Sequence, residues 1–323
     1  MAQLVGIAKL AAESPSLEAK RRVEYFELAS RKLLARCDSP RMPFRWMINP
    51  YRGCEFGCKY CYARYTHEFM ELREPEDFER KIFAKHFDGK AFLADLRKLP
   101  KGERISIGSA TDPYQPAERR FRLTRLVLEA FARTSGYHLG LITKSDLVAR
   151  DIDVFQEVAK RHRLTLTVTV TTMDRELARL LEPLAPRPDL RIAAIERLAS
   201  AGLRVTVNCC PILPLINDSE ASMNAVARAS AAAGARSIGA SVVYLKPCAY
   251  KVFLPFLDQH FPHLSRRYRE RFGDTAYVRG AYPETIHKRL ERVRERHGLN
   301  QTEDAQEPET WVTDEGAQLE LFS

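Results

Sequence analysis

The sequence lacks any stretch of about 18 consecutive apolar residues, which is the length that a membrane-spanning helix needs, so we expect no integral membrane protein. Seven cysteines in 323 residues are too few for a disulfide scaffold. The opening residues MAQLVGIAKLAAES are mildly apolar, but Lys9 interrupts them and no basic region precedes them, so they make a poor signal peptide. These absences favour a cytoplasmic protein.

Charge is unevenly distributed along the chain. The sequence has 51 Lys and Arg against 42 Asp and Glu, a formal net charge of +9, and 45% of its residues are hydrophobic, enough for a sizeable core. Residues 301–323 hold five Glu, two Asp and no Lys or Arg, which indicates a solvated flexible tail and leaves +16 on residues 1–300. This excess permits a polyanionic partner but does not identify one.

The most basic stretch is 263–297, with nine Arg and one Lys against five acidic residues. Its composition favours helices with interleaved charges, so we interpret it first as solvated helical faces. Contact with nucleic acid is the alternative for six of its arginines: Arg266, Arg267, Arg269, Arg289, Arg292 and Arg296.

The middle of the chain alternates between β-rich runs and helical patterns. Helical patterns such as DFERKIFAKHF (77–87) and GKAFLADLRKL (89–99) separate the runs, which predicts parallel strands with right-handed crossovers. The pattern fits either a doubly wound sheet or a barrel, although no GxGxxG follows the first strand. The β-rich runs are WMINPY (46–51), RISIGS (104–109), LGLIT (139–143), LTLTVTVT (164–171), RVTVNC (204–209) and SIGASVVYL (237–245).

Polar segments follow the second and later runs, beginning with GSATDPYQP and TKSD. In parallel α/β folds the carboxyl ends of the strands carry the functional site, so we expect the chemistry there.

Three cysteines, Cys54, Cys58 and Cys61, lie together in INPYRGCEFGCKYCYAR, directly after the first β-rich run. Structural zinc needs four ligands, and the next cysteine along the chain is Cys209, so a zinc site would need a residue such as His67. Three thiolates on one loop instead suit a [4Fe–4S] cluster that keeps one iron open for an exogenous ligand. We favour the cluster.

CEFGCKYC is the CxxxCxxC signature of the radical S-adenosylmethionine (SAM) superfamily. Together with IGSATDPYQPAERRFRLTR, ITKSDLVARDID and PILPLIND, it makes residues 40–300 resemble the branch related to spore photoproduct lyase, which is often described as DNA-repair-photolyase-like. Several motifs in the same order make this resemblance specific.

The resemblance implies an α/β fold, a partial (β/α)6 TIM-like barrel with a C-terminal helical extension. We expect an N-terminal extension over 1–45, the barrel with the cysteine loop over 46–247, an Arg-rich helical extension over 248–300 and the acidic flexible tail over 301–323. In that family the open iron chelates SAM, and an electron from the cluster cleaves SAM to methionine and a 5′-deoxyadenosyl radical. An electron donor such as a flavodoxin or ferredoxin is implied as a partner.

The resemblance also implies roles for particular residues. Cys54, Cys58 and Cys61 would ligate three irons, and Tyr60 would lie against the adenine of SAM. The methionyl ammonium would lie near Ser109, Thr111 and Asp112, and Lys144 suits the methionyl carboxylate. Each of these residues has a plainer interpretation: Tyr60 could pack the loop, Ser109, Thr111 and Asp112 could form an ordinary turn, and Lys144 could be a surface lysine.

One departure from the family concerns the substrate. Spore photoproduct lyases carry a cysteine near the second strand end that returns a hydrogen atom to the product radical, whereas this chain has Ser109 or Ala110 there. A hydroxyl is a much poorer hydrogen-atom donor, so lyase activity on thymine photodimers is not supported. Cys209, Cys210 and Cys248 could donate instead, although Cys209 and Cys210 fit better as small packed residues.

The chain closes on AQLELFS, in which QLELF resembles the peptide by which bacterial repair proteins bind the sliding DNA clamp. An acidic tether ending in an apolar pentamer makes physical sense as a docking segment. The alternative is a segment that folds back onto its own domain. The residues that would contact the clamp are Gln318, Leu319, Leu321 and Phe322.

Three functions remain in competition. The first is a radical SAM enzyme acting on nucleic acid, plausibly damaged DNA. The second is a radical SAM enzyme modifying a protein or small metabolite, and the third is a non-enzymatic zinc or iron–sulfur binding module. The third explains the cysteines but leaves GSATDPYQP and TKSD at successive strand ends unexplained.

Overall fold

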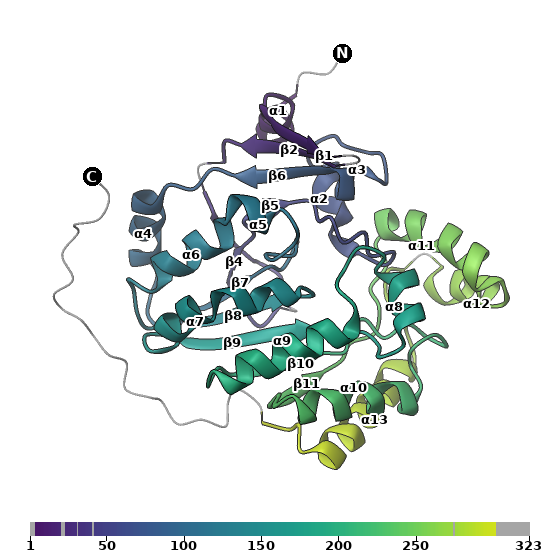
Figure 1. Cartoon of the computed structure of the whole chain (residues 1–323). Helices are drawn as coiled ribbons and strands as arrows, with labels where there is room; N and C mark the ends of the chain where they lie inside the picture. Colours follow the sequence, from purple (N-terminus) through teal and green to yellow (C-terminus); the bar gives the residue numbers. More distant parts are fainter. Residues whose placement is uncertain (1–3, 21–22, 31, 41, 274, 302–323) are drawn as a thin grey trace.

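The structure, a computed structural model, describes residues 4–20, 23–30, 32–40, 42–273 and 275–301. They form two sheets, one of seven strands and one of four, which lie one above the other in Figure 1. The residues proposed for clamp binding, Gln318, Leu319, Leu321 and Phe322, lie outside the described part. In the described part, no helix is long and apolar enough to cross a membrane.

The large sheet has the strand order β11-β10-β9-β8-β7-β4-β3. All neighbouring pairs from β4 to β11 are parallel, and β3 pairs antiparallel with β4 at the edge. Each of the six β-rich runs therefore supplies a strand to this sheet. The strands are β3 (Leu34–Arg36), β4 (Trp46–Ile48), β7 (Arg104–Ile107), β8 (His138–Thr143), β9 (Arg163–Thr169), β10 (Val205–Asn208) and β11 (Ser237–Gly239).

Successive side chains of a strand point to opposite faces of the sheet. One face of the large sheet packs against helices. In β8, Leu139 and Leu141 are buried in the main core, whereas Gly140 and Ile142 on the other face are only partly buried. The result is the partial (β/α)6 barrel that the family resemblance implies. The crossover helices are α4 (Gly89–Arg97), α6 (Leu123–Phe131), α7 (Ile152–Ala159), α8 (Arg175–Leu181), α9 (Pro188–Ser200) and α10 (Glu220–Ala232), with α5 (Glu118–Phe121) and η2 (Asp146–Asp151) as short additional turns.

The small sheet has the order β1-β2-β6-β5 and draws on distant segments: β1 (Ser16–Lys20), β2 (Val23–Leu28), β5 (Tyr51–Arg52) and β6 (Lys81–Lys85). The helix predicted over 77–87 is wrong beyond α3 (Asp77–Arg80), because β6 follows at once. Ile82 and Ala84 pack on one face of this sheet and Phe83 on the other. The parallel partner β2 comes far earlier in the chain, so this burial is invisible to local periodicity.

The chain ends in three helices: α11 (Pro247–His260), α12 (Pro262–Phe272) and α13 (Tyr282–His297). Several arginines of this extension are engaged inside the molecule. Arg269 pairs with Asp258, Arg292 and Arg296 pair with Glu220, and Arg289 donates to the carbonyl oxygen of Asp218. These contacts support the interpretation of the stretch as helical faces over the interpretation as a nucleic-acid surface.

Candidate functional site

The three-cysteine loop follows β5 and leads into η1 (Tyr62–Arg64) and α2 (Tyr65–Glu68). Cys54 and Cys58 are buried among apolar side chains, and Cys61 is half-buried. Burial raises the pKa of all three thiols, that of Cys58 to about 12. Such thiols ionise only with a strong positive partner, which a metal cluster provides.

The geometry of the loop bears on which metal group fits. Within the described residues, no three His, Cys, Asp or Glu side chains converge closely enough to hold a single metal ion. A multi-iron cluster does not need such convergence, because each cysteine binds a different iron. Three thiols on one short loop suit such a cluster, with one iron left for another ligand.

His67, the alternative fourth ligand for zinc, is engaged elsewhere. Its Nε2 lies 2.9 Å from the carbonyl oxygen of Lys81, and its ring packs edge-on against Phe78 at 5.2 Å. Burial lowers the pKa of His67 to about 4. These contacts favour His67 as a packing residue over a zinc ligand, with its buried Nδ1 making no hydrogen bond.

Hydrogen bonds from the β7 end fix the start of the cysteine loop. The carbonyl oxygen of Gly53 accepts from Thr111 Oγ1 (2.6 Å) and Gln115 Nε2 (3.0 Å). Gln115 Oε1 accepts from the backbone N–H of Glu55 (3.0 Å), whose carboxylate accepts from Tyr25 OH (3.0 Å). The DPYQ segment after β7 therefore holds the loop at the carboxyl end of the barrel.

Gly53 is needed where the loop leaves β5. Its φ is +84°, and an added Cβ would lie 2.8 Å from the carbonyl oxygen of Phe78 and 2.9 Å from that of Lys81. We expect Gly53→Ala to lower the free energy of unfolding by about 2–5 kcal/mol, from left-handed strain plus backbone overlap. Gly202→Ala is the matched control, with φ +81° and no atom within 4 Å, and should cost about 1–2 kcal/mol. Urea unfolding measures both, and equal costs would contradict this account of Gly53.

Asp112 follows β7 and fastens it to β8. Its Oδ1 accepts from Thr143 Oγ1 (2.6 Å) and the backbone N–H of Tyr114 (2.9 Å), and its Oδ2 accepts from the backbone N–H of Lys144 (2.7 Å). Burial raises the pKa of Asp112, and these hydrogen bonds offset part of that effect. Asp112 thus positions the Lys144 backbone, while its contact with the methionyl ammonium stays a prediction.

Ser109 lies beside the cysteine loop. Its Oγ accepts from Asn49 Nδ2 (3.2 Å), and its carbonyl oxygen accepts from Tyr62 OH. Asn49 Oδ1 also accepts from the backbone N–H of Ala110 (2.8 Å). These hydrogen bonds join the ends of β4 and β7. The signal for Asn49 in the sequence is its place in the first β-rich run, directly after the last residue of β4.

Lys144, at the end of β8, points toward the loop. Its Nζ lies 5.7 Å from the centroid of the Tyr60 ring. Burial acts to lower the pKa of Lys144, but the neighbouring Cys58 and Glu182 outweigh it and raise the pKa overall. Lys144 therefore carries a positive charge beside Tyr60 and Cys58, and its contact with the methionyl carboxylate, which the family resemblance implies, stays a prediction.

A buried ion pair under Tyr60 was not predicted from the sequence. Tyr60 OH donates to Glu182, whose carboxylate accepts from Thr171 Oγ1 (2.7 Å) and pairs with Arg191 at 2.6 Å. Both charged side chains are 1% exposed. Burial acts to raise the pKa of Glu182, but Arg191 and Lys144 lower it overall. Nothing in their helical segments marks Glu182 or Arg191 as partners, because their pairing is tertiary.

The remaining cysteines near the barrel mouth differ in exposure. Cys209 is buried in the core, as the sequence predicts. Cys210 is half-buried at the end of β10, and its Sγ accepts from the backbone N–H of Ser241 (3.0 Å). The Sγ of Cys248 lies 3.9 Å from the carbonyl oxygen of Tyr62. Cys210 is therefore only partly packed, whereas the sequence indicates a small packed residue.

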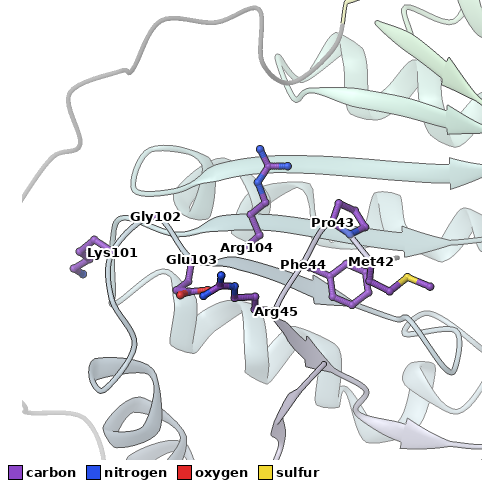
Figure 2. Close-up of a pocket in the computed structure, with 8 residues that line it drawn as sticks. All are labelled: Met42, Pro43, Phe44, Arg45, Lys101, Gly102, Glu103 and Arg104. Atoms are coloured by element: carbon purple, nitrogen blue, oxygen red, sulfur yellow. The ribbon is translucent and has the colours of Figure 1, made fainter. Parts of the chain in front are cut away.

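A hollow of about 410 Å³ lies away from this site (Figure 2). Its lining includes Arg45, Glu103 and Arg104, and Arg104 begins β7. The cysteine loop lies at the opposite, carboxyl ends of the strands. We therefore place the functional site at the barrel mouth and not in this hollow.

Comparison with known proteins identifies the family. A family model for the radical SAM superfamily matches residues 48–225, more than half of the chain. The uncharacterized protein Rv2578c of Mycobacterium tuberculosis is 32% identical over 282 residues, which cover 87% of this chain and 83% of that protein. The uncharacterized protein MJ0683 of Methanocaldococcus jannaschii is 30% identical over 183 residues, 54% of this chain and 63% of that protein.

Among solved structures, spore photoproduct lyase complexed with dinucleoside spore photoproduct has the same fold. The TM-score is 0.61 at 17% identity, over 84% of this chain and 79% of that chain. The chain belongs to the radical SAM superfamily. It is an enzyme of the kind that combines SAM with an iron–sulfur cluster, and the predicted superfamily and barrel are confirmed.

Proposed function

We propose that this enzyme cleaves SAM reductively at a [4Fe–4S] cluster bound by Cys54, Cys58 and Cys61, and that it acts on nucleic acid. The observation that carries the first part is the placement of the CxxxCxxC loop at the carboxyl ends of the barrel strands, beside the charged side chain of Lys144. When bound, the cluster supplies the electron that splits the SAM sulfonium into methionine and a 5′-deoxyadenosyl radical. The electron comes from a donor such as a flavodoxin or ferredoxin.

The protein binds and orients SAM. Lys144 neutralises the methionyl carboxylate, and the ring of Tyr60 offers an apolar face to the adenine. Asp112 supports these contacts by holding the backbone of Lys144 at the end of β8, and Thr111 supports them by holding the Gly53 carbonyl oxygen. Ser109 lies next to both residues at the barrel mouth. Half-buried and buried side chains around the loop keep water from the reactive centre.

The proposal of a nucleic-acid substrate is supported by the charge of the chain and by its fold. The +16 carried by residues 1–300 suits a polyanion. The structurally similar lyase was solved with a dinucleoside spore photoproduct. Because Ser109 and Ala110 stand where the lyase family has its hydrogen-donating thiol, the product here arises by a different final hydrogen transfer.

Lys144→Met tests the SAM site. Losing a charge-assisted contact with a carboxylate costs about 1.5–3 kcal/mol, so we expect the KM for SAM to rise by about 10- to 150-fold. Lys160→Met is the matched control, because Lys160 is exposed on the far side of the barrel wall and pairs with Glu157. Initial rates of 5′-deoxyadenosine formation at varied SAM measure both, and an unchanged KM in Lys144→Met would remove Lys144 from the site.

The reaction itself is tested on the wild-type chain after anaerobic reconstitution with iron and sulfide. With dithionite and SAM we expect methionine and 5′-deoxyadenosine in equal amounts. A folded protein with a full cluster that never cleaves SAM would overturn the proposal. The substrate class is tested by binding at rising salt, with duplex DNA, single-stranded DNA and an acidic protein compared as competitors. Salt-dependent competition by DNA and not by the acidic protein would favour a nucleic-acid substrate over a protein or metabolite substrate.

The C-terminal peptide is a separate proposal. Gln318, Leu319, Leu321 and Phe322 are proposed to bind the sliding clamp through an apolar pocket. We expect a pull-down with purified clamp to be lost when residues 317–323 are removed. Capture that survives the truncation would contradict it.

A further inference from the structure

Exposed and half-buried aromatic rings form a continuous row beside the cysteine loop. We define the tyrosine row as Tyr65, Tyr62, Tyr244 and Tyr277, with ring centroids 6.5, 6.1 and 4.5 Å apart in that order. Phe69 continues it beyond Tyr65 at 5.5 Å. Tyr62, Tyr277 and Phe69 are 38%, 42% and 59% exposed. Large aromatic side chains at this exposure, in contact with one another, indicate a binding surface.

The row leads into the site. Tyr62 OH donates to the carbonyl oxygen of Ser109 at the β7 end, so this ring lies at the mouth of the barrel. Tyr65 belongs to α2, Tyr244 follows β11, and Tyr277 lies between α12 and α13. In Figure 1, α2, α11 and α12 lie on the right of the barrel, with α2 facing α11, whereas β11 and α13 lie along its lower edge. A ligand on the row would therefore extend toward the reacting centre.

Positive side chains flank the Tyr65 end of the row. Lys246 Nζ lies 3.8 Å from the centroid of the Tyr65 ring. Arg52 reaches the carbonyl oxygen of Thr66 at 3.5 Å, and its buried Nε makes no hydrogen bond. Lys85 is only 8% exposed, and the charge of Arg52 acts on it. Arg52 faces Phe83 across β5 and β6, so the side chains of Arg52 and Lys85 lie on the same face of the small sheet.

This cation set consists of the half-buried Arg52 and Lys246 and the buried Lys85, and it differs from the buried arginines of the molecule. Arg64 pairs with Glu79 and Arg191 pairs with Glu182, whereas in the described part of the chain no carboxylate forms an ion pair with any member of the set. Burying like charges side by side without a counter-charge is costly. An anion bound here would remove that cost, so the site favours a negatively charged ligand.

We propose that the tyrosine row and the cation set together bind an unpaired stretch of nucleic-acid strand. The phosphates lie on Arg52, Lys85 and Lys246, and the bases stack on the exposed rings. Stacking on side chains requires bases whose faces are free, which a duplex does not offer. The role in catalysis rests on the proposed function, whereas strand binding stands independently of SAM cleavage.

The test is fluorescence anisotropy with a labelled oligothymidylate of about 15 nucleotides and the reconstituted, SAM-bound protein. We expect Tyr277→Leu and Phe69→Leu each to weaken binding by about 5- to 150-fold, because one stacked base is lost. Tyr277→Trp should restore binding, since it keeps a flat ring. Lys246→Gln should reduce the slope of log affinity against log salt by about 0.7, the value for one phosphate of a single strand.

Two exposed residues away from the row serve as controls. Leu126→Ala on α6 and Lys288→Gln on α13 should leave the affinity unchanged, as both lie outside the proposed surface. The fully paired duplex should bind more weakly than the single strand.

Three results would overturn the proposal. The first is an unchanged affinity for the strand in Tyr277→Leu and Lys246→Gln, and the second is tighter binding of the duplex than of the single strand. The third is displacement of the labelled strand by an acidic peptide such as polyglutamate as effectively as by unlabelled strand, which would indicate a protein partner. Assaying 5′-deoxyadenosine in the same preparation keeps the two proposals apart. A protein that cleaves SAM without binding the strand overturns only the surface, and one that binds the strand without cleaving SAM overturns only the reaction.

Discussion

Replacing Cys58 by alanine is expected to abolish SAM cleavage and to lower iron content. Cys58 is the central thiol of the loop, and its side chain is buried. Changes to groups that merely support metal ligands cost about 10- to 100-fold, so losing a ligand should reduce 5′-deoxyadenosine formation by at least about 100-fold. The measurement is product formation per protein, with iron and sulfide content determined alongside.

Cys37→Ala is the matched control, because Cys37 is half-buried and lies after β3, outside the cysteine loop. It should keep both the iron and the product. Wild-type turnover in Cys58→Ala would refute the assignment of this cysteine, and loss of turnover in both variants would point to general damage of the fold.

The second large effect is expected on stability. Arg191→Met leaves the Glu182 carboxylate buried without its counter-charge, which costs about 3–5 kcal/mol. Because Glu182 also accepts a hydrogen bond from Tyr60, we expect the loss of stability to extend to the cysteine loop. The double variant Arg191→Met/Glu182→Leu removes both charges and should recover most of the lost stability. Urea unfolding at neutral pH gives all three free energies.

Arg269→Met provides the comparison for a surface pair. Arg269 and Asp258 are 49% and 47% exposed, and such pairs are worth about 0–1 kcal/mol. If Arg191→Met cost no more than Arg269→Met, the buried pair would have no special structural role.

The large sheet and the place of the cysteine loop at the carboxyl ends of its strands could be predicted from the sequence, because both depend on local signals. The β-rich run 164–171 has the alternation of β9, and GSATD follows β7 as the carboxyl-end rule requires. The CxxxCxxC spacing marks the loop without any structural information. These features need no partner from elsewhere in the chain.

The features that were missed depend on contacts between distant segments. β6 looked helical because its partner β2 lies more than fifty residues earlier. Glu182 ends α8 and Arg191 lies in α9, and nothing in either segment marks the two residues as partners of each other or of Tyr60. The tyrosine row joins residues 62 and 277, which no local pattern connects.

The central claim is that the three cysteines hold a cluster with one iron open to SAM. The most direct measurement is electron–nuclear double resonance on the reduced, reconstituted protein with SAM that carries ¹⁵N at its amino group. We predict a hyperfine coupling between the reduced cluster and this nitrogen that is absent without SAM. A reduced cluster that shows no coupling at saturating SAM, or a chain that holds zinc in place of iron, would contradict the account.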